Sequence, residues 1–319
     1  MSTTNSSLDG APHASVAAVV RTAAGLEAGE GPSNEAIESA VAEFAGQFEY
    51  WFTRVIAKSV GKYRILIVRR INALIRPIEF DGLSVDDVAT RLVTDYVNRN
   101  FVTAGGWAIE KLAIAIAATT GGTKAASRGI DLERTDGPGN RHLYVIKSGT
   151  VTRNSDILSK LKQHARDAER LIRQGGAKVA VFANYVVATG ATASTFEDGI
   201  HRPSSGEFWS EVTGLSEPKA LALVSEIAKV AGRQVAKDTD AHIAALVMLV
   251  RTYVCDPNDP ANVDWPFIFK ITMTRKEGWI TEDASRHQRA IAALTESGYT
   301  IIKEPARVKA VASKKPQNK

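Results

Sequence analysis

The chain has 319 residues, of which 44% are hydrophobic and 24% are charged, with 40 lysines and arginines against 35 aspartates and glutamates. This apolar fraction is ordinary for a globular protein and excludes wholesale disorder and the fibrous classes. The single cysteine, Cys255, excludes an internal disulfide, and no spacing of Cys and His resembles a zinc site. The net charge of +5 indicates a polyanionic partner only if it lies on the folded part of the chain.

Both ends of the chain are predicted to be solvated segments. Residues 1–33 are rich in Ser, Thr, Ala and Gly, and the tail from Ala306 has five basic residues and no acid. The first segment lacks the basic start and apolar stretch of a secretory signal. The longest apolar runs, Leu112–Ala118 and Ile243–Val250, are shorter than the roughly 18–20 residues that span a bilayer. We therefore expect a protein of a reducing cytoplasm.

Residues 34–103 have the apolar spacing of amphipathic helices. Within them, Trp51–Arg76 carries seven basic residues and no acid, interleaved with aliphatic side chains. This stretch is either a DNA-facing helix or a packed helix with long basic stems. Pro77 is expected to end it, because proline lacks the amide donor of a helix interior. Gly105-Gly106 then punctuates the chain before the next helix.

The middle of the chain alternates helices and strands. A buried helix is predicted at Trp107–Thr119, and two short strands, Gly129–Glu133 and His142–Lys147, follow it. A long helix from Ser155 or Asp156 to about Gln174 and a buried strand at Val179–Val187 come next. This order predicts an α/β fold, in which a small mixed sheet is flanked by helices, with helical additions at both ends.

The same patterns divide the chain into five predicted segments. These are a disordered N-terminal segment (1–33), a helical region (34–103), an α/β core (104–214), a mostly helical C-terminal region (215–305) and a basic disordered tail (306–319).

Two acids and a lysine are predicted to meet in the strand pair. Asp131 and Glu133 are two residues apart and should share a strand face, while Lys147 shares the face of Leu143 and Val145. A hairpin would bring Asp131, Glu133 and Lys147 into one patch. Carboxylates are ligands that Mg²⁺ prefers, and a lysine can orient an attacking water or offset developing charge. These are the groups that phosphodiester hydrolysis needs.

The segment Gly-Ile-Asp131…Tyr-Val-Ile-Lys147-Ser-Gly resembles the catalytic hairpin of the PD-(D/E)xK nucleases, and specifically of type II restriction endonucleases. The preceding helix with Glu110 and the downstream Gly206-Glu-Phe-Trp209 support the resemblance, which covers about Ala104 to Gly214.

This resemblance implies that residues 104–214 form a restriction-endonuclease-like core. It also implies that Asp131 is the first metal carboxylate and Lys147 the motif lysine. Members of the family cut both strands of DNA as homodimers with Mg²⁺, leaving 5′-phosphate and 3′-hydroxyl ends.

The chain departs from the family pattern two residues before Lys147, where Val145 replaces the expected Glu, Asp or Gln. A valine cannot bind a metal. The missing carboxylate must come from elsewhere, or the site is inactive. Glu110 is the first choice, because an acid in so apolar a helix is costly unless it is paired or bound to metal. Glu133 is the second, and the backbone carbonyl of Ile146 can supply a further metal oxygen.

Residues after the motif are predicted to contact DNA phosphates. A polar loop lies at the start of the helix beginning near Ser155, where backbone amides favour anions. A basic stripe along that helix either meets phosphates or is simply its solvated face. The predicted contact residues are Thr150, Thr152, Arg153, Asn154, Lys162 and Arg166, and Arg170 and Arg173 continue the stripe.

The resulting hypothesis is a sequence-specific double-stranded DNA endonuclease, a type II restriction enzyme. It would act as a homodimer with Mg²⁺ as cofactor and have a DNA methyltransferase as its genetic partner. Val145 leaves open a catalytically inactive, nuclease-like DNA-binding protein. The same chemistry would also serve a structure-specific repair or phage nuclease.

Overall fold

The computed structural model describes residues 14–61, 67–68, 71–137, 139–149, 155–174, 180–190, 193–197, 199–273 and 280–300. Its contacts divide the chain into two compact units. We call Met1–Gln47 with Gly105–Gln234 the sheet unit, and Phe48–Ala104 with Val235–Lys319 the helical unit. The division falls inside α2 (Asn34–Gly61), α4 (Val85–Ala117) and α7 (Glu217–Val254). The division into five segments that the sequence predicts differs from these two units and stays a prediction.

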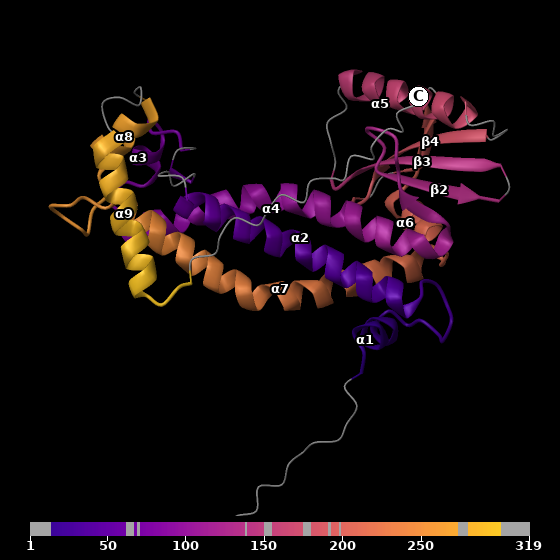
Figure 1. Cartoon of the computed structure of the whole chain (residues 1–319), viewed down its shortest axis with the longest axis horizontal. Helices are drawn as coiled ribbons and strands as arrows, with labels where there is room; N and C mark the ends of the chain where they lie inside the picture. Colours follow the sequence, from indigo (N-terminus) through magenta and orange to yellow (C-terminus); the bar gives the residue numbers. More distant parts are fainter. Residues whose placement is uncertain are drawn as a thin grey trace, which may run out of the picture. The chain divides into compact units, whose positions relative to one another are not determined.

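The sheet unit contains a six-stranded mixed sheet in the order β1-β2-β3-β4-β6-β5. Figure 1 labels β2, β3 and β4 of this sheet. β3 runs parallel to β4, and β4 runs parallel to β6, whereas the other neighbours are antiparallel. The strands are β1 (Gly122–Lys124), β2 (Leu132–Asp136), β3 (Asn140–Lys147), β4 (Ala180–Val187), β5 (Thr195–Glu197) and β6 (Ile200–Arg202). This architecture confirms the predicted α/β fold.

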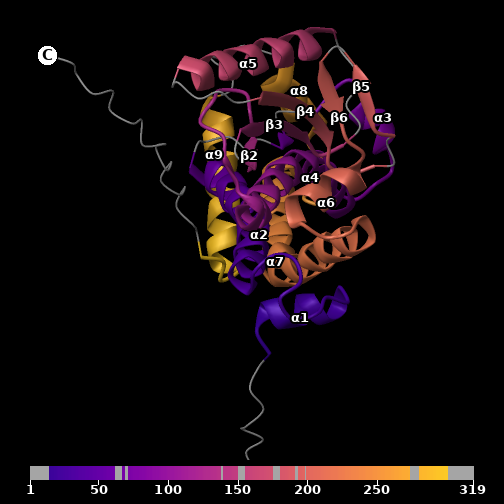
Figure 2. The same ribbon diagram turned by 90° about the vertical axis from the view of Figure 1, so that its right-hand side faces the viewer.

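Helices cover both faces of the sheet. α5 (Ser155–Gln174) lies on one face, and α6 (Ser205–Thr213) lies on the other with the Gly105–Ala117 part of α4 (Figures 1 and 2). The α5 face holds the core cluster in which Leu143 and Val145 of β3 pack with Leu161. On the α6 face, the ring of Tyr144 lies 5.9 Å from that of Phe208. β3 is therefore apolar at consecutive positions, because alternate side chains enter two different cores.

α4 passes through Gly105-Gly106 without a break, so the prediction that these glycines punctuate the chain is wrong. A glycine in a helix interior is unfavourable by about 1 kcal/mol relative to alanine. Here the lost side chain permits a close approach, because a Cβ on Gly106 would lie 3.3 Å from Oγ of Ser148. Gly106 therefore lets α4 pack closely against the end of β3, where Ser148 follows Lys147.

The N-terminal segment that was expected to be disordered contains α1 (Val16–Ala23) in its described part. Ser15 caps this helix, and Val20 is fully buried. The side chain of Arg21 donates to Asn34 at 2.7 Å and to the carbonyl of Glu30 at 2.8 Å. Composition alone missed this helix, because its stability comes from burial and from these bonds to the start of α2.

The helical unit is built from parts of α2, α4 and α7 together with α3 (Arg76–Glu79), α8 (Trp265–Met273) and α9 (Ile280–Glu296). Its buried cation is Arg286, which is 2% exposed, pairs with Asp264 and lies 3.9 Å from the ring centroid of Phe267. Pro77 lies in the first turn of α3 rather than at the end of a long helix. α2 ends earlier, at Gly61, so Trp51–Arg76 does not form the single helix that was expected.

Among the described helices, Val85–Thr120 is long and apolar enough to suit a membrane span by length and composition, and an 18-residue window within it has a mean hydropathy of 1.4. The run Leu112–Ala118 considered in the sequence was shorter because Glu110 and Lys111 precede it. A core helix of a soluble protein has the same composition, and Ala113 and Ile116 are fully buried in the sheet unit. Of the 18-residue window that gives this hydropathy, 33% is buried.

Candidate active site

Asp131 is held at the point where the pairing of β2 with β3 ends. β2 begins at Leu132, whose partner in register is Tyr144. The amide of Asp131 donates to the carbonyl of Tyr144 at 2.8 Å. Its carboxylate oxygen Oδ2 accepts from the amide of Ile146, also at 2.8 Å. The side chain of Asp131 thus accepts a hydrogen bond that a strand carbonyl would otherwise accept. One bond from its backbone and one to its side chain fix the position of Asp131.

The carbonyl of Ile146 faces the same side of β3 as Asp131. In an antiparallel ladder, the N–H and C=O of one residue point to the same neighbouring strand. The amide of Ile146 points toward Asp131, to which it donates. β2 begins opposite Tyr144 and does not extend as far as Ile146. A backbone oxygen is thereby placed beside the Asp131 carboxylate, at the end of β2.

Glu110 approaches the same place from α4. Gly106 lies one turn before it, and residues four apart share a helix face. Because Gly106 packs against Ser148, this face of α4 is turned toward the end of β3. The carboxylate of Glu110 pairs with the ammonium group of Lys124 in β1. Gly122 permits the pairing, since a Cβ there would lie 2.5 Å from that of Ala117 and push β1 away from α4.

The electrostatics of Asp131 link it to its neighbours. Burial raises the pKa of its carboxyl group above the ordinary value, and the hydrogen bond from Ile146 opposes this rise. The negative charge of Glu110 also raises this pKa, whereas the ammonium groups of Lys147 and Lys124 lower it. The charges of Glu110, Lys147 and Lys124 therefore all act on Asp131, and we call these four side chains the cluster.

Glu133 lies differently from the prediction. Its carboxylate pairs with Arg141 of β3 rather than facing Asp131 as a second site acid. Ile130 belongs to the core cluster of Leu143 on the α5 face, although Leu132 is paired with Tyr144. Side chains alternate regularly between the two faces of the sheet only from Leu132 onward. The two-residue spacing of Asp131 and Glu133 is therefore not enough to place both acids on one face.

Val145 is part of the core and not of the site. It is buried in the α5-face cluster with Leu161 and Tyr185. A carboxylate at this position would be buried among apolar side chains unless it were bound or paired. Within the described residues, no group of three or more His, Cys, Asp and Glu side chains gathers as a metal site. The oxygen donors of the cluster are the carboxylates of Asp131 and Glu110 and the carbonyl of Ile146.

The predicted DNA contacts fall into two groups. The loop residues Thr150, Thr152, Arg153 and Asn154 lie outside the described residues. Lys162 is half-buried and Arg166 is exposed, both on α5. Further along the helix the stripe is partly neutralised, since Arg170 lies 3.6 Å from Asp167 and Arg173 lies 2.6 Å from Glu169.

Two features of the site were missed in the sequence. Lys124 lies in a strand of three residues, which is too short to produce a periodic signal. His164 of α5 packs against the backbone just before Asp131, because a Cβ on Gly129 would lie 2.5 Å from the Cδ2 of His164. Gly129 also has a φ of +78°, which favours glycine. Gly129 itself could have been noticed in the sequence as a turn residue. Its contact with His164, which is far away in the sequence, could not.

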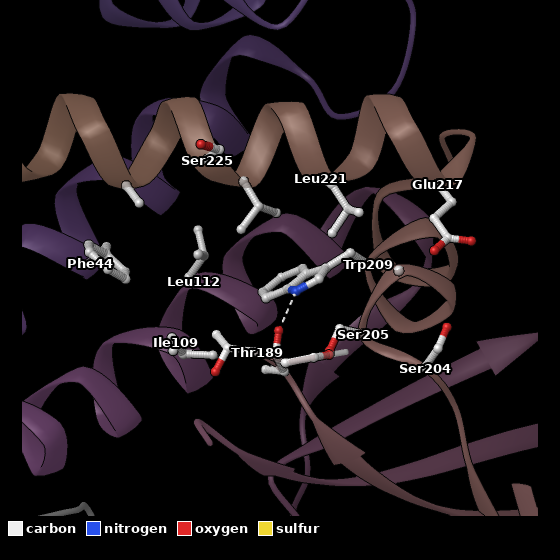
Figure 3. A pocket seen from close by; sticks show the side chains of 15 residues that line it. Phe44, Ile109, Leu112, Thr189, Ser204, Ser205, Trp209, Glu217, Leu221 and Ser225 are labelled. Carbon is white, nitrogen blue, oxygen red and sulfur yellow. Dashed lines mark hydrogen bonds between the residues drawn. The ribbon is translucent and has the colours of Figure 1, made fainter. Parts of the chain in front are cut away.

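A cavity of about 570 Å³ is lined by residues of α2, α4, α6 and α7 and by the residues that follow β4 (Figure 3). Trp209 forms one wall, and its Nε1 donates to the carbonyl of Ala188 at 2.9 Å. Ile109, the neighbour of Glu110, lines another part. The described lining contains no basic side chain and none of the predicted site residues. The cavity is therefore a poor place for a phosphate.

The comparison with known families agrees with this geometry. The family model of the type II restriction endonuclease EcoO109I matches residues 69–235, which is just over half of the 319 residues and includes every residue of the cluster. No curated protein matches the chain. Restriction endonucleases are nucleases that act on DNA, and the resemblance found in the sequence was to the same class of enzyme. The chain belongs to the EcoO109I family of type II restriction endonucleases.

Proposed function

We propose that this protein is a Mg²⁺-dependent, sequence-specific endonuclease that cuts double-stranded DNA as a homodimer and leaves 5′-phosphate ends. The observation that carries the proposal is the cluster of Asp131, Glu110 and Lys147 around the ends of β2 and β3, with the electrostatic links that act on Asp131. Family membership supports the nuclease activity and the DNA substrate.

The donor set of the cluster fits a magnesium ion. Asp131 and Glu110 would hold it through carboxylate oxygens, and Ile146 through its carbonyl. All three are hard oxygen ligands of the kind that Mg²⁺ prefers. The mutual repulsion of the two acids, which raises the pKa of Asp131, is relieved by a cation between them. When bound, Mg²⁺ polarises the phosphate and lowers the pKa of a bound water.

The protein's own groups supply position and charge. Asp131 is held by its bonds to Tyr144 and Ile146, so its carboxylate does not reorganise during the reaction. Lys147 ends β3, where its ammonium group orients the attacking water or offsets charge on the phosphate. Lys162 and Arg166 on α5, with Thr150, Thr152, Arg153 and Asn154, contact backbone phosphates, which fix register without reading sequence.

The same proposal implies a genetic partner, a dimeric enzyme and a cellular location. An enzyme that cuts short sequences endangers the DNA of its own cell, so a DNA methyltransferase that protects those sequences is the expected genetic partner. A homodimer cuts both strands at a two-fold symmetric site, since each subunit contributes one cluster. The proposed location is the cytoplasm, where the DNA substrate is reached.

Digestion of a plasmid in Mg²⁺ tests the proposal. The wild-type protein is expected to produce discrete bands, and Asp131→Asn to cut about 10³-fold more slowly or not at all, because the group removed acts directly at the reacting centre. Binding of the variant to duplex DNA in Ca²⁺ should be retained.

The matched control is Asp136→Asn, which removes an acid from the other end of the same strand. It is expected to cut at the wild-type rate. Cleavage by Asp131→Asn at the wild-type rate would overturn the site assignment.

A second candidate function is a DNA-binding protein that has lost catalysis, and Val145 is the residue that favours it. This candidate predicts retention of duplex DNA without nicking in Mg²⁺ or Mn²⁺. A repair or phage nuclease that recognises DNA structure would cut branched or nicked substrates, and it would produce no discrete bands from a relaxed plasmid. One plasmid digest therefore distinguishes the sequence-specific endonuclease, the inactive DNA-binding protein and the structure-specific nuclease.

A further inference from the structure

Lys124 is the one member of the cluster that neither the motif nor the family resemblance assigns. It lies in β1, and its ammonium group pairs with the carboxylate of Glu110 on α4. The side chain of Glu110 is 23% exposed and that of Lys124 is 55% exposed. The carboxylate is thus largely enclosed, whereas more than half of the lysine side chain is open to solvent.

We propose that Lys124 is an internal counter-ion that competes with the metal ion for the carboxylate of Glu110, so that metal binding displaces the lysine. The inference rests on the proposed function, because it requires Glu110 to be a metal ligand.

The charge balance of the cluster supports this competition. Asp131 and Glu110 are offset by Lys124 and Lys147, so the four side chains have a formal sum of zero. Removal of Lys124 leaves a net charge of −1 and an unpaired Glu110, and both changes increase the attraction for a divalent cation.

The weakness of the ion pair makes the displacement feasible. Ion pairs of exposed lysines are typically weak, and a bound divalent cation attracts the same oxygens with twice the charge. Lys124 therefore lowers the metal affinity without preventing metal binding. By the same argument, Lys124 holds the carboxylate of Glu110 in place in the metal-free protein, which lowers the reorganisation needed when the ion arrives.

The experiment measures metal affinity in the absence of DNA. Mn²⁺ or Ca²⁺ is titrated calorimetrically into the full-length protein and into Lys124→Met, which keeps the length of the side chain but removes its charge. The expected result is a dissociation constant about fivefold lower in the variant, the factor expected for loss of an exposed ion pair. Lys124→Arg, which keeps the charge, should restore the wild-type affinity.

Lys111→Met is the matched control. Lys111 is the neighbour of Glu110 on α4, is 46% exposed, and pairs with Glu43 at 3.5 Å. Its loss removes the same charge from the helix that carries Glu110 without freeing a site carboxylate. Its metal affinity is expected to equal that of the wild type.

The failures of the two proposals are distinguishable. If Glu110→Gln and Asp131→Asn bind the metal as the wild type does, the cluster is not the metal site and both proposals fail. If these two variants lose the metal but Lys124→Met binds it no more tightly than the wild type, only the role of Lys124 is overturned. An equal gain in Lys111→Met would also overturn it, since the effect would then be one of general charge.

Discussion

Asp131 carries a charge in a place that disfavours it. Burial and the neighbouring Glu110 raise the pKa of its carboxyl group, although the amide of Ile146 and two lysines partly compensate. Residues that serve catalysis are often held in environments that reduce the stability of the folded state. The same residue that the site needs as an anion is therefore expected to destabilise the fold at neutral pH.

Asp131→Asn should consequently be more stable than the wild type at pH 7–8. With a raised pKa, the folded protein binds the proton more tightly than the unfolded chain, so the ionised form destabilises the fold above the folded pKa. This penalty disappears as the pH falls below the ordinary value of 3.8. Asparagine is neutral throughout, and its oxygen can still accept from Ile146.

Thermal unfolding followed by circular dichroism measures the difference. A gain of 1 kcal/mol corresponds to about 2–4 °C in Tm for a domain of this size. The gain should shrink toward zero between pH 7 and pH 4. Asp136→Asn, on the exposed end of β2, should show no such pH-dependent gain, and a lower Tm for Asp131→Asn at pH 7 would contradict the argument.

At the scale of elements, the site depends on close contacts between segments that are far apart in the sequence. Gly106 brings α4 against the residue after β3, and Gly129 brings the segment before Asp131 against α5. Neither contact buries a large area. Each instead sets the distance at which a charged side chain lies, and a displacement of about 1 Å can reduce catalysis about 10²-fold.

Gly129→Ala is therefore expected to cut DNA about 10–100-fold more slowly while remaining folded. Its new methyl group would overlap the ring of His164 and shift the backbone that leads into Asp131. Initial rates of plasmid cleavage measure the effect.

Gly137→Ala separates this clash from general backbone strain. Gly137 also has a positive φ, of +62°, but a Cβ there would meet nothing within 4 Å. It should lose some stability and keep its activity. Combining Gly129→Ala with His164→Ala removes the overlap and should recover part of the rate. Equal losses in the Gly129 and Gly137 variants would show that the contact with His164 is unimportant.

The elements that the sequence predicted are those with a strong local signal. The second halves of β3 and β4 are buried at successive positions, and α5 has a regular amphipathic stripe. β1, β5 and β6 have three residues each and exist only through pairing with their neighbours. Asp131 and Lys147 were found from their spacing, whereas Lys124 required the packing of β1 on α4, which no local pattern encodes.

At the scale of the whole molecule, formal charge divides the chain into a neutral body and a basic tail. The tail from Ala306 carries five basic residues and no acid, and this equals the whole excess of 40 − 35 = 5. The candidate cluster is itself formally neutral, and the end of the α5 stripe is paired with acids. Long-range attraction to DNA is therefore expected to come largely from the tail, and the choice of cutting site from elsewhere.

Removal of residues 306–319 should weaken non-specific DNA binding and reduce its salt dependence. Each lysine or arginine that contacts a phosphate contributes about 0.9 to the slope of log K against log salt, so five contacts would contribute about 4.5. Fluorescence anisotropy with non-cognate duplex at several salt concentrations measures the slope. A full-length variant with the five basic residues replaced by glutamine isolates charge from chain length. Both proteins should still cut at the same positions, because phosphate contacts carry no sequence information. An unchanged slope would mean that the basic residues of the body, and not the tail, hold the DNA.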